Sequence, residues 1–200
     1  MNLMKKKQLT SREEQILLLL KEFDFLTRDQ LSRHFNLGKV RNTNRVLFNL
    51  SNYLMTVKEG QRTVYYLSKI GRDYVDCDKI RKKGNHIKHF IMRNQFWLFC
   101  KCPRDWKNEI KISNGKTSVI TDAVYTRNGF YHFLEVDNLQ TMKENQAKII
   151  RYKNLLESLI QQYGYHPTLI WVTTTEYRRR QLEKACEGLK VKVYTIDDIK

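Results

Sequence analysis

Long apolar runs are absent from this chain. The longest, Ile16–Leu20, is far shorter than the roughly 20 residues that a membrane-spanning helix requires. The basic triplet Lys5–Lys7 is not followed by an apolar segment with a small-residue cleavage site, so no signal peptide is indicated. Cysteine is scarce, with 4 residues in 200, which provides no disulfide framework and suits a reducing compartment. These absences predict a cytoplasmic protein that does not enter a membrane.

The spacings of a zinc site are also absent. His86 and His89 are separated by two residues and Cys100 and Cys102 by one, whereas tetrahedral zinc sites usually use C-x2-C or H-x3-5-H pairs. The aromatic run Phe96–Phe99 beside the two cysteines favours buried free thiols. We therefore expect no cofactor, apart from Mg²⁺ in one interpretation of the second domain.

Positive charge is what the chain has in excess. Lys and Arg number 37 and Asp and Glu 21, which gives a formal charge of +16 and an isoelectric point of about 9.7. This excess predicts attraction to a polyanion, for which nucleic acid is the expected partner. The excess is densest in residues 77–104, which contain 8 basic residues and 1 acidic residue. We place a basic linker at residues 77–85, between a first domain at residues 1–76 and a second at residues 86–200.

The first domain begins with a pattern of three helices. Thr10 and Thr27 are suited to be N-caps, the first for a helix that contains the apolar run and the second for a short helix that ends at Phe35. A third helix is predicted over residues 39–53, because apolar residues and a threonine recur there at spacings of three and four. This inward stripe consists of Val40, Thr43, Leu47, Leu50 and Leu54.

A predicted hairpin follows, with β-prone runs at residues 55–57 and 63–67. Helix, short helix, turn, longer helix and hairpin is an order that resembles a winged helix-turn-helix. The recognition helix of such a domain buries one face and presents donors to base edges and phosphates on the other. Arginine can pair with guanine and asparagine with adenine, and both occur on the outward face here. The candidate DNA-binding residues are Lys39, Arg41, Asn42, Arg45 and Asn49 on the helix, and Lys58, Gln61 and Arg62 in the hairpin turn.

The second domain mixes a strand meander with strand–helix–strand crossovers. Its α-β-β-β-α-β-α-β order predicts a mixed five-stranded sheet covered by helices, so the whole chain is expected to be α+β. The predicted helices are residues 86–100, 143–163 and 176–187, and the predicted strands are residues 108–112, 118–125, 130–137, 168–174 and 191–195.

Acidic residues stand on two adjacent strands of this domain. Asp122 follows Val-Ile-Thr, and Glu135 and Asp137 belong to Phe-Leu-Glu-Val-Asp on the next strand. Side chains two residues apart on a strand project from the same face, so Glu135 and Asp137 are expected to share one. An aspartate, an E-x-K triplet and a following helix resemble the PD-(D/E)XK nuclease fold. Asp137 replaces the lysine of that triplet, so the resemblance implies a restriction-nuclease-like domain that has lost a catalytic residue.

The following helix offers a basic candidate. Lys148 and Tyr152 are four residues apart and share a helix face, at a place similar to the Q-x-x-x-Y motif of the recombination-type branch of this fold. In a catalytic interpretation, two acids hold Mg²⁺ and the lysine assists the attacking water. In a structural one, the acids make internal hydrogen bonds, and the missing triplet lysine favours this second interpretation. The candidate catalytic residues are Asp122, Glu135 and Lys148, supported by Glu109, Asp137 and Tyr152, with Asp122 and Glu135 as the metal ligands of an active enzyme.

The segments together resemble the replication-relaxation family of Gram-positive plasmids and mobile elements. The resemblance rests on residues 45–50 and 64–71, and on Trp106-x-x-Glu109, residues 120–123 and 133–137, and Lys148-x-x-x-Tyr152. It implies a role in plasmid replication control or DNA relaxation. Asn138 stands where the family is expected to have arginine, so neither a phosphate contact nor an ion pair is expected from that position.

These observations lead to one preferred function and two alternatives. We expect a sequence-specific double-stranded DNA-binding protein that acts in replication control or transcription regulation of a mobile element. A homodimer is expected, because helix-turn-helix proteins often read paired half-sites. The first alternative is a Mg²⁺-dependent endonuclease or nickase targeted by the same winged helix. The second is a protein-interaction adaptor that binds DNA without sequence preference.

Overall fold

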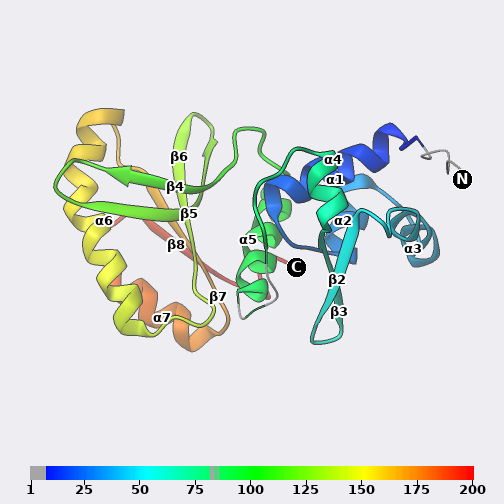
Figure 1. The fold of residues 1–200 in the computed structure, drawn as a ribbon. Helices are drawn as coiled ribbons and strands as arrows, with labels where there is room; N and C mark the ends of the chain where they lie inside the picture. The colour runs from blue at the N-terminus through cyan, green and yellow to red at the C-terminus, as the bar shows by residue number, and fades with distance from the viewer. Residues whose placement is uncertain (1–7, 82–83, 85) are drawn as a thin grey trace, which may run out of the picture. The chain divides into compact units, whose positions relative to one another are not determined.

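The computed structural model describes residues 8–81, 84 and 86–200, and it divides the chain into two compact units, residues 1–90 and 91–200 (Figure 1). The division falls inside α5 (Ile87–Phe99), and the described residues of the predicted linker, 77–81 and 84, fall in the first unit. Arg81 in this segment contacts the same unit: its Nε donates to Asp24 Oδ1 at 2.7 Å, and its guanidinium lies over the Phe90 ring. Positions 82, 83 and 85 of the linker and Lys5–Lys7 lie outside the described residues.

The first unit follows the predicted order of elements. Thr10 and Thr27 each form a capping box, with Glu13 and Gln30, as the sequence indicated for the first two helices. The hairpin strands pair antiparallel, and a short strand that the sequence did not predict joins them in a sheet of order β1-β3-β2. The elements are α1 (Ser11–Phe23), β1 (Leu26–Thr27), α2 (Arg28–Phe35), α3 (Val40–Asn49), β2 (Leu54–Glu59), β3 (Arg62–Leu67) and α4 (Lys69–Tyr74).

The third helix differs from its prediction in two respects. It ends at Asn49 rather than near Tyr53, and the residues after it form turns that include a hydrogen bond from Tyr53 N to Leu50 O. Thr43 and Leu47 are buried as predicted, but Val40 is 54% exposed. Val40 is the first residue of the helix, so no preceding turn covers its side chain.

A glycine in α4 allows a close backbone approach in the first unit. A Cβ at Gly71 would lie 2.1 Å from the carbonyl oxygen of Tyr53, which also accepts a hydrogen bond from Ser68 N. A side chain at this position would therefore collide with backbone that is held in place. The glycine in the motif at residues 64–71 has a packing role.

The second unit is a five-stranded mixed sheet of order β4-β5-β6-β7-β8. The first three strands form an antiparallel meander, and β7 and β8 continue parallel to β6 through the crossover helices α6 and α7. This is the predicted mixed sheet, and it confirms the α+β class. The elements are β4 (Lys107–Ser113), β5 (Ser118–Arg127), β6 (Phe130–Val136), α6 (Met142–Tyr163), β7 (Thr168–Thr173), α7 (Glu176–Ala185) and β8 (Val191–Thr195).

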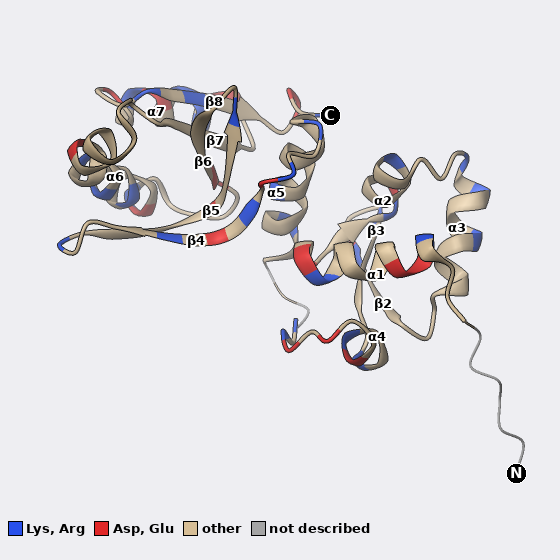
Figure 2. Ribbon diagram, turned by 90° about the horizontal axis from the view of Figure 1, so that it is seen from above, with Lys and Arg blue, Asp and Glu red and all other residues tan. Residues whose placement is uncertain are grey.

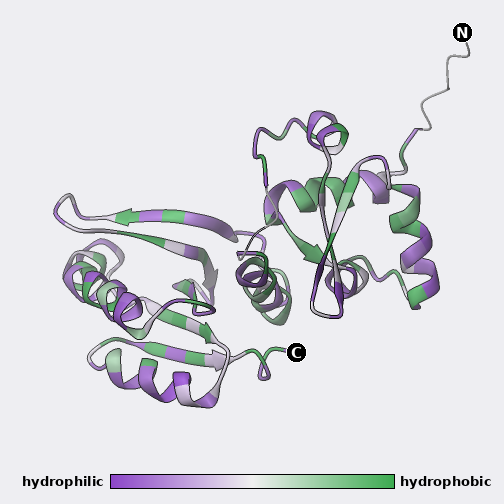
Figure 3. Cartoon of the chain, turned by 60° about the horizontal axis from the view of Figure 1, so that its bottom comes forward, coloured by the Kyte–Doolittle hydropathy of each residue, from purple (hydrophilic) through white to green (hydrophobic). Residues whose placement is uncertain are grey.

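Helices α6 and α7 cover one face of this sheet. The core beneath them contains Phe133, Trp171 and Val193 from three neighbouring strands, together with Tyr152 and Leu182 from the two helices. Figure 3 shows hydrophilic and hydrophobic residues side by side along α6, as expected of a helix with one buried face. Strand residues at the alternate positions project to the other face of the sheet. Over the described part of the chain, no helix has the length and apolar character needed to span a membrane.

Candidate functional site

The acidic residues singled out in the sequence lie where β5 and β6 run beside α6. Glu135 and Asp137 both contact α6, Glu135 through Lys148 and Tyr152 and Asp137 through Asn145. The two carboxylates therefore project from the same face, as the two-residue spacing predicted. We call the group formed by Asp122, Glu135, Asp137, Lys148, Tyr152 and Arg178 the acidic centre.

Glu135 is fully enclosed in this centre. Its Oε1 accepts a hydrogen bond from Tyr152 Oη at 2.6 Å, and its Oε2 forms a close ion pair with Lys148 Nζ. Burial, followed by the charge of nearby Asp122, raises the pKa of Glu135 well above its usual range, and Lys148 and Tyr152 oppose the rise. Both carboxylate oxygens already have protein partners.

Asp122 supports the backbone of the next strand. Its Oδ2 accepts a hydrogen bond from Val136 N at 2.7 Å, beyond Ala123 and Leu134, the last residues at which β5 and β6 pair. The carboxylate therefore takes the place of a strand carbonyl for the amide that follows Glu135. This hydrogen bond gives Asp122 a structural role that does not require a metal ion.

Asp137 has a cationic partner that the sequence analysis missed. Arg178, in the first turn of α7, donates to both carboxylate oxygens, with Nε 2.6 Å from Oδ2, and Thr173 and Asn145 donate as well. Burial disfavours the charge, but these hydrogen bonds outweigh it and lower the pKa of Asp137. The sequence indicated Lys148 as the basic residue near these acids, whereas the charge of Asp137 is neutralised by Arg178.

Glu109 has a cationic neighbour of its own. It is on β4 with a positive φ of 55°, and its Oε1 is 4.0 Å from Nη1 of the buried Arg93. Among the residues that the structure describes, no three Asp, Glu, His or Cys side chains come together in a way that could hold a metal ion.

The donor set of the acidic centre does not fit Mg²⁺. This ion requires ionised carboxylates with free lone pairs in near-octahedral geometry. Here one carboxylate is protonated more readily than usual and bonded at both oxygens, and another is held in a bidentate arginine pair. The arrangement is instead that of a buried network of ion pairs and hydrogen bonds between the sheet and two helices.

The candidate DNA-binding residues of the first unit lie mainly at the surface. The residues on α3 include basic side chains and, over Val40–Asn49, no Asp or Glu (Figure 2). Asn42 is only partly exposed. Its Nδ2 donates to Leu37 O at 2.7 Å, and its Oδ1 accepts a hydrogen bond from Arg45 Nη2 at 2.9 Å. Asn42 thus holds the turn and orients Arg45. The exposed members are Lys39, Arg41, Arg45, Asn49, Lys58, Gln61 and Arg62.

A model of the replication-relaxation family matches residues 17–169, which is most of the chain. A search of curated protein sequences finds no match.

Three solved structures are similar at low identity, and this chain spans about half the length of each. Protein VC1899 from Vibrio cholerae is 12% identical with a TM-score of 0.43, over 97% of this chain and 55% of that one. A repair endonuclease from Pyrococcus abyssi is 20% identical with a TM-score of 0.32, over 70% and 54%. Can2 from Sulfobacillus thermosulfidooxidans, in complex with cyclic tetra-adenylate, is 12% identical with a TM-score of 0.35, over 92% and 52%.

Proposed function

Because the chain belongs to the replication-relaxation family, we propose that it is a sequence-specific double-stranded DNA-binding protein of a plasmid or other mobile element. Its role is replication control or transcription regulation. The observation that carries the proposal is the exposed basic face of α3, on which Arg41 and Arg45 stand one helical turn apart. Arginines at this spacing suit neighbouring guanines or phosphates in a major groove.

The N-terminal end of α3 has the features of a base-reading segment. Recognition helices contact base edges mainly with their N-terminal residues. At this end Lys39 and Arg41 are exposed, and Val40 is an exposed apolar residue of the kind that contacts a thymine methyl group. The burial of Thr43 and Leu47 on the other side holds the helix against its own unit.

The hairpin β2–β3 supplies the wing of the proposed winged helix. Its turn contains Gly60 with a positive φ of 57°, and Gln61 and Arg62 beside it are exposed. Lys58 donates to Thr63 Oγ1 at 2.8 Å across the hairpin, which keeps one basic side chain close to the turn. Basic and amide groups at a wing tip suit the sugar–phosphate backbone, where they add affinity without sequence preference.

The acidic centre has a structural role in this proposal. Its carboxylates are bonded within the fold, and Lys148 and Arg178 neutralise two of them. The endonuclease alternative requires these bonds to open to a metal ion. Nicking of supercoiled DNA in the presence of Mg²⁺ or Mn²⁺, if abolished by Asp122→Ala and by Glu135→Ala, would overturn the structural role.

The test of DNA recognition is selection of binding sites from a random duplex pool with the full chain. A double variant, Arg41→Ala with Arg45→Ala, should lose the preference for the selected site, since each arginine–guanine pair contributes about 1–3 kcal/mol of discrimination. Lys69→Ala removes an exposed charge on α4 and serves as the matched control. Full affinity and specificity in the double variant would refute the proposal.

A homodimer that reads paired half-sites is part of the same proposal. The selected sites should then be inverted repeats whose half-sites are about 34–36 Å apart or a multiple of that distance. Selection of single half-sites, each bound by one chain per duplex, would contradict the dimer. This result would not contradict DNA recognition by α3.

A further inference from the structure

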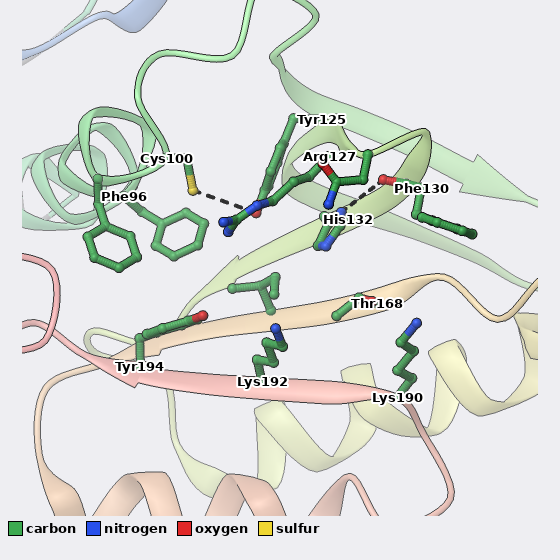
Figure 4. A pocket seen from close by; sticks show the side chains of 13 residues that line it. Phe96, Cys100, Tyr125, Arg127, Phe130, His132, Thr168, Lys190, Lys192 and Tyr194 are labelled. Atoms are coloured by element: carbon green, nitrogen blue, oxygen red, sulfur yellow. Dashed lines mark hydrogen bonds between the residues drawn. The ribbon is translucent and has the colours of Figure 1, made fainter.

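A cavity lies on the face of the five-stranded sheet opposite α6 and α7. It has a volume of about 350 Å³ and is lined by side chains of α5, β5, β6, β7 and β8, with Lys190 from just before β8 (Figure 4). Its strand residues alternate with those of the core: His132 and Ile170 line the cavity, whereas Phe133 and Trp171 pack beneath the helices. We call it the aromatic–basic pocket.

Three cations converge on this pocket. Arg127, Lys190 and Lys192 all line it with exposed side chains, and the described lining residues include no Asp or Glu. Burial lowers the pKa of His132, and the charges of these three residues lower it further. His132 is therefore a neutral ring at neutral pH, surrounded by positive charge that no lining carboxylate offsets. Such a site attracts an anion.

Aromatic rings form much of the remaining wall. Tyr125 stacks on His132 with ring centres 5.0 Å apart and an angle of 22°, and Trp106 stacks on the other side of Tyr125. Phe130 is 45% exposed at the edge of the pocket, and the Nζ of Lys190 is 5.8 Å from its ring centre. Tyr165 packs edge-on against the same ring, with centroids 4.8 Å apart, and the exposed part of the Phe130 ring remains accessible to a ligand.

We propose that the aromatic–basic pocket binds a nucleotide, with the base stacked against the aromatic wall and the phosphate between Arg127, Lys190 and Lys192. Each feature contributes to this assignment: a simple anion requires no rings, and an apolar ligand requires no cations. A cavity of this size also lies within the range of about 300–1,000 Å³ that is usual for small-ligand sites. Bases paired in a duplex are stacked on each other and cannot reach the wall, so the ligand is a free nucleotide or an unpaired nucleotide of a strand.

This site is independent of the proposed duplex recognition by the first unit. Binding is measured by fluorescence anisotropy with the full chain, a labelled ten-nucleotide oligothymidylate, and thymidine monophosphate or inorganic phosphate as competitor. Phe130→Leu keeps an apolar side chain but removes the ring, and should weaken binding about fivefold or more. Arg127→Ala should weaken it at least threefold and reduce the salt slope by about 0.7. Lys153→Ala, an exposed lysine on α6 over the opposite face, is the matched control and should change the dissociation constant less than twofold.

The competitors identify the source of the nucleotide. If thymidine monophosphate displaces the probe at a similar concentration per nucleotide, the ligand is a free nucleotide. If the oligonucleotide binds much more tightly, the ligand is an unpaired strand. Both results support the site. Equal losses in Lys153→Ala and the pocket variants, or displacement by inorganic phosphate as effective as by the nucleotide, overturn it. Both pocket variants should keep specific duplex binding, so failure of this proposal is distinguishable from failure of the first.

Discussion

Replacing Arg178 with alanine should destabilise the second unit by about 3 kcal/mol at neutral pH. Removal of one partner from a buried ion pair typically costs about 3–5 kcal/mol, because the other charge stays buried. The lower end applies here, since the Arg178 side chain is 23% exposed and water can enter its place. Thr173 and Asn145 also continue to donate to Asp137.

The loss should depend on pH in a defined direction. In the wild-type protein the pKa of Asp137 is lowered, so its stabilisation is present above the unfolded pKa of about 3.9 and disappears as the pH falls through the folded pKa. Without Arg178, burial dominates and raises the pKa of this carboxyl. On acidification the carboxyl of the variant is therefore protonated, which removes the cost of its buried unpaired charge. The difference between the two proteins should therefore be largest near pH 7 and shrink towards pH 4.

Urea unfolding followed by tryptophan fluorescence measures this difference. All 3 tryptophans, Trp97, Trp106 and Trp171, belong to the second unit, so the signal reports on that unit alone. Arg180 on the same helix is 77% exposed, and Arg180→Ala should change the free energy of unfolding by less than about 0.5 kcal/mol. The reasoning is refuted if Arg178→Ala costs no more than this control, or if its cost does not shrink on acidification.

Three further predictions concern other buried contacts. Glu135→Gln should gain stability relative to wild type as the pH rises. The pKa of Glu135 is raised, so the contribution of this residue to stability is lost as the pH passes the folded pKa. Urea unfolding at pH 5 and pH 8 measures the difference, and an equal difference at both pH values would contradict the prediction. Tyr152→Phe should cost about 1–3 kcal/mol by the same urea assay, since it removes a buried hydrogen bond to a carboxylate, and a neutral effect would count against the network. Gly71→Ala should destabilise the first unit by about 1–3 kcal/mol in calorimetry, and an unchanged transition would show that the Tyr53 carbonyl can move.

Much of the fold could be predicted because the signals are local. The N-caps at Thr10 and Thr27 act within one helical turn, and both occur in the structure. The two-residue period of β6 placed Glu135 and Asp137 on one face, and the contacts of both with α6 confirm it. The two-residue strand β1 was missed, because so short a segment has no periodicity to read.

The chemistry of the acidic centre was harder to predict because its partners are distant in sequence. Arg178 is 41 residues from Asp137, and the sequence around each residue does not predict that the two form an ion pair. One signal was present: Arg178 stands in the first turn of α7, where a cation opposes the helix dipole and calls for a carboxylate partner. The aromatic–basic pocket had no such signal, since its lining comes from five elements.

The period of two in β6 also links the acidic centre to the aromatic–basic pocket. Glu135 and His132 belong to the same strand and face opposite sides of the sheet. Point substitutions can therefore alter either face while leaving the other intact. A shift of the whole strand β6 by one residue would instead exchange the two faces, bringing the acid among the pocket cations and the imidazole into the core. The spacing of residues along this strand therefore positions both sites at once.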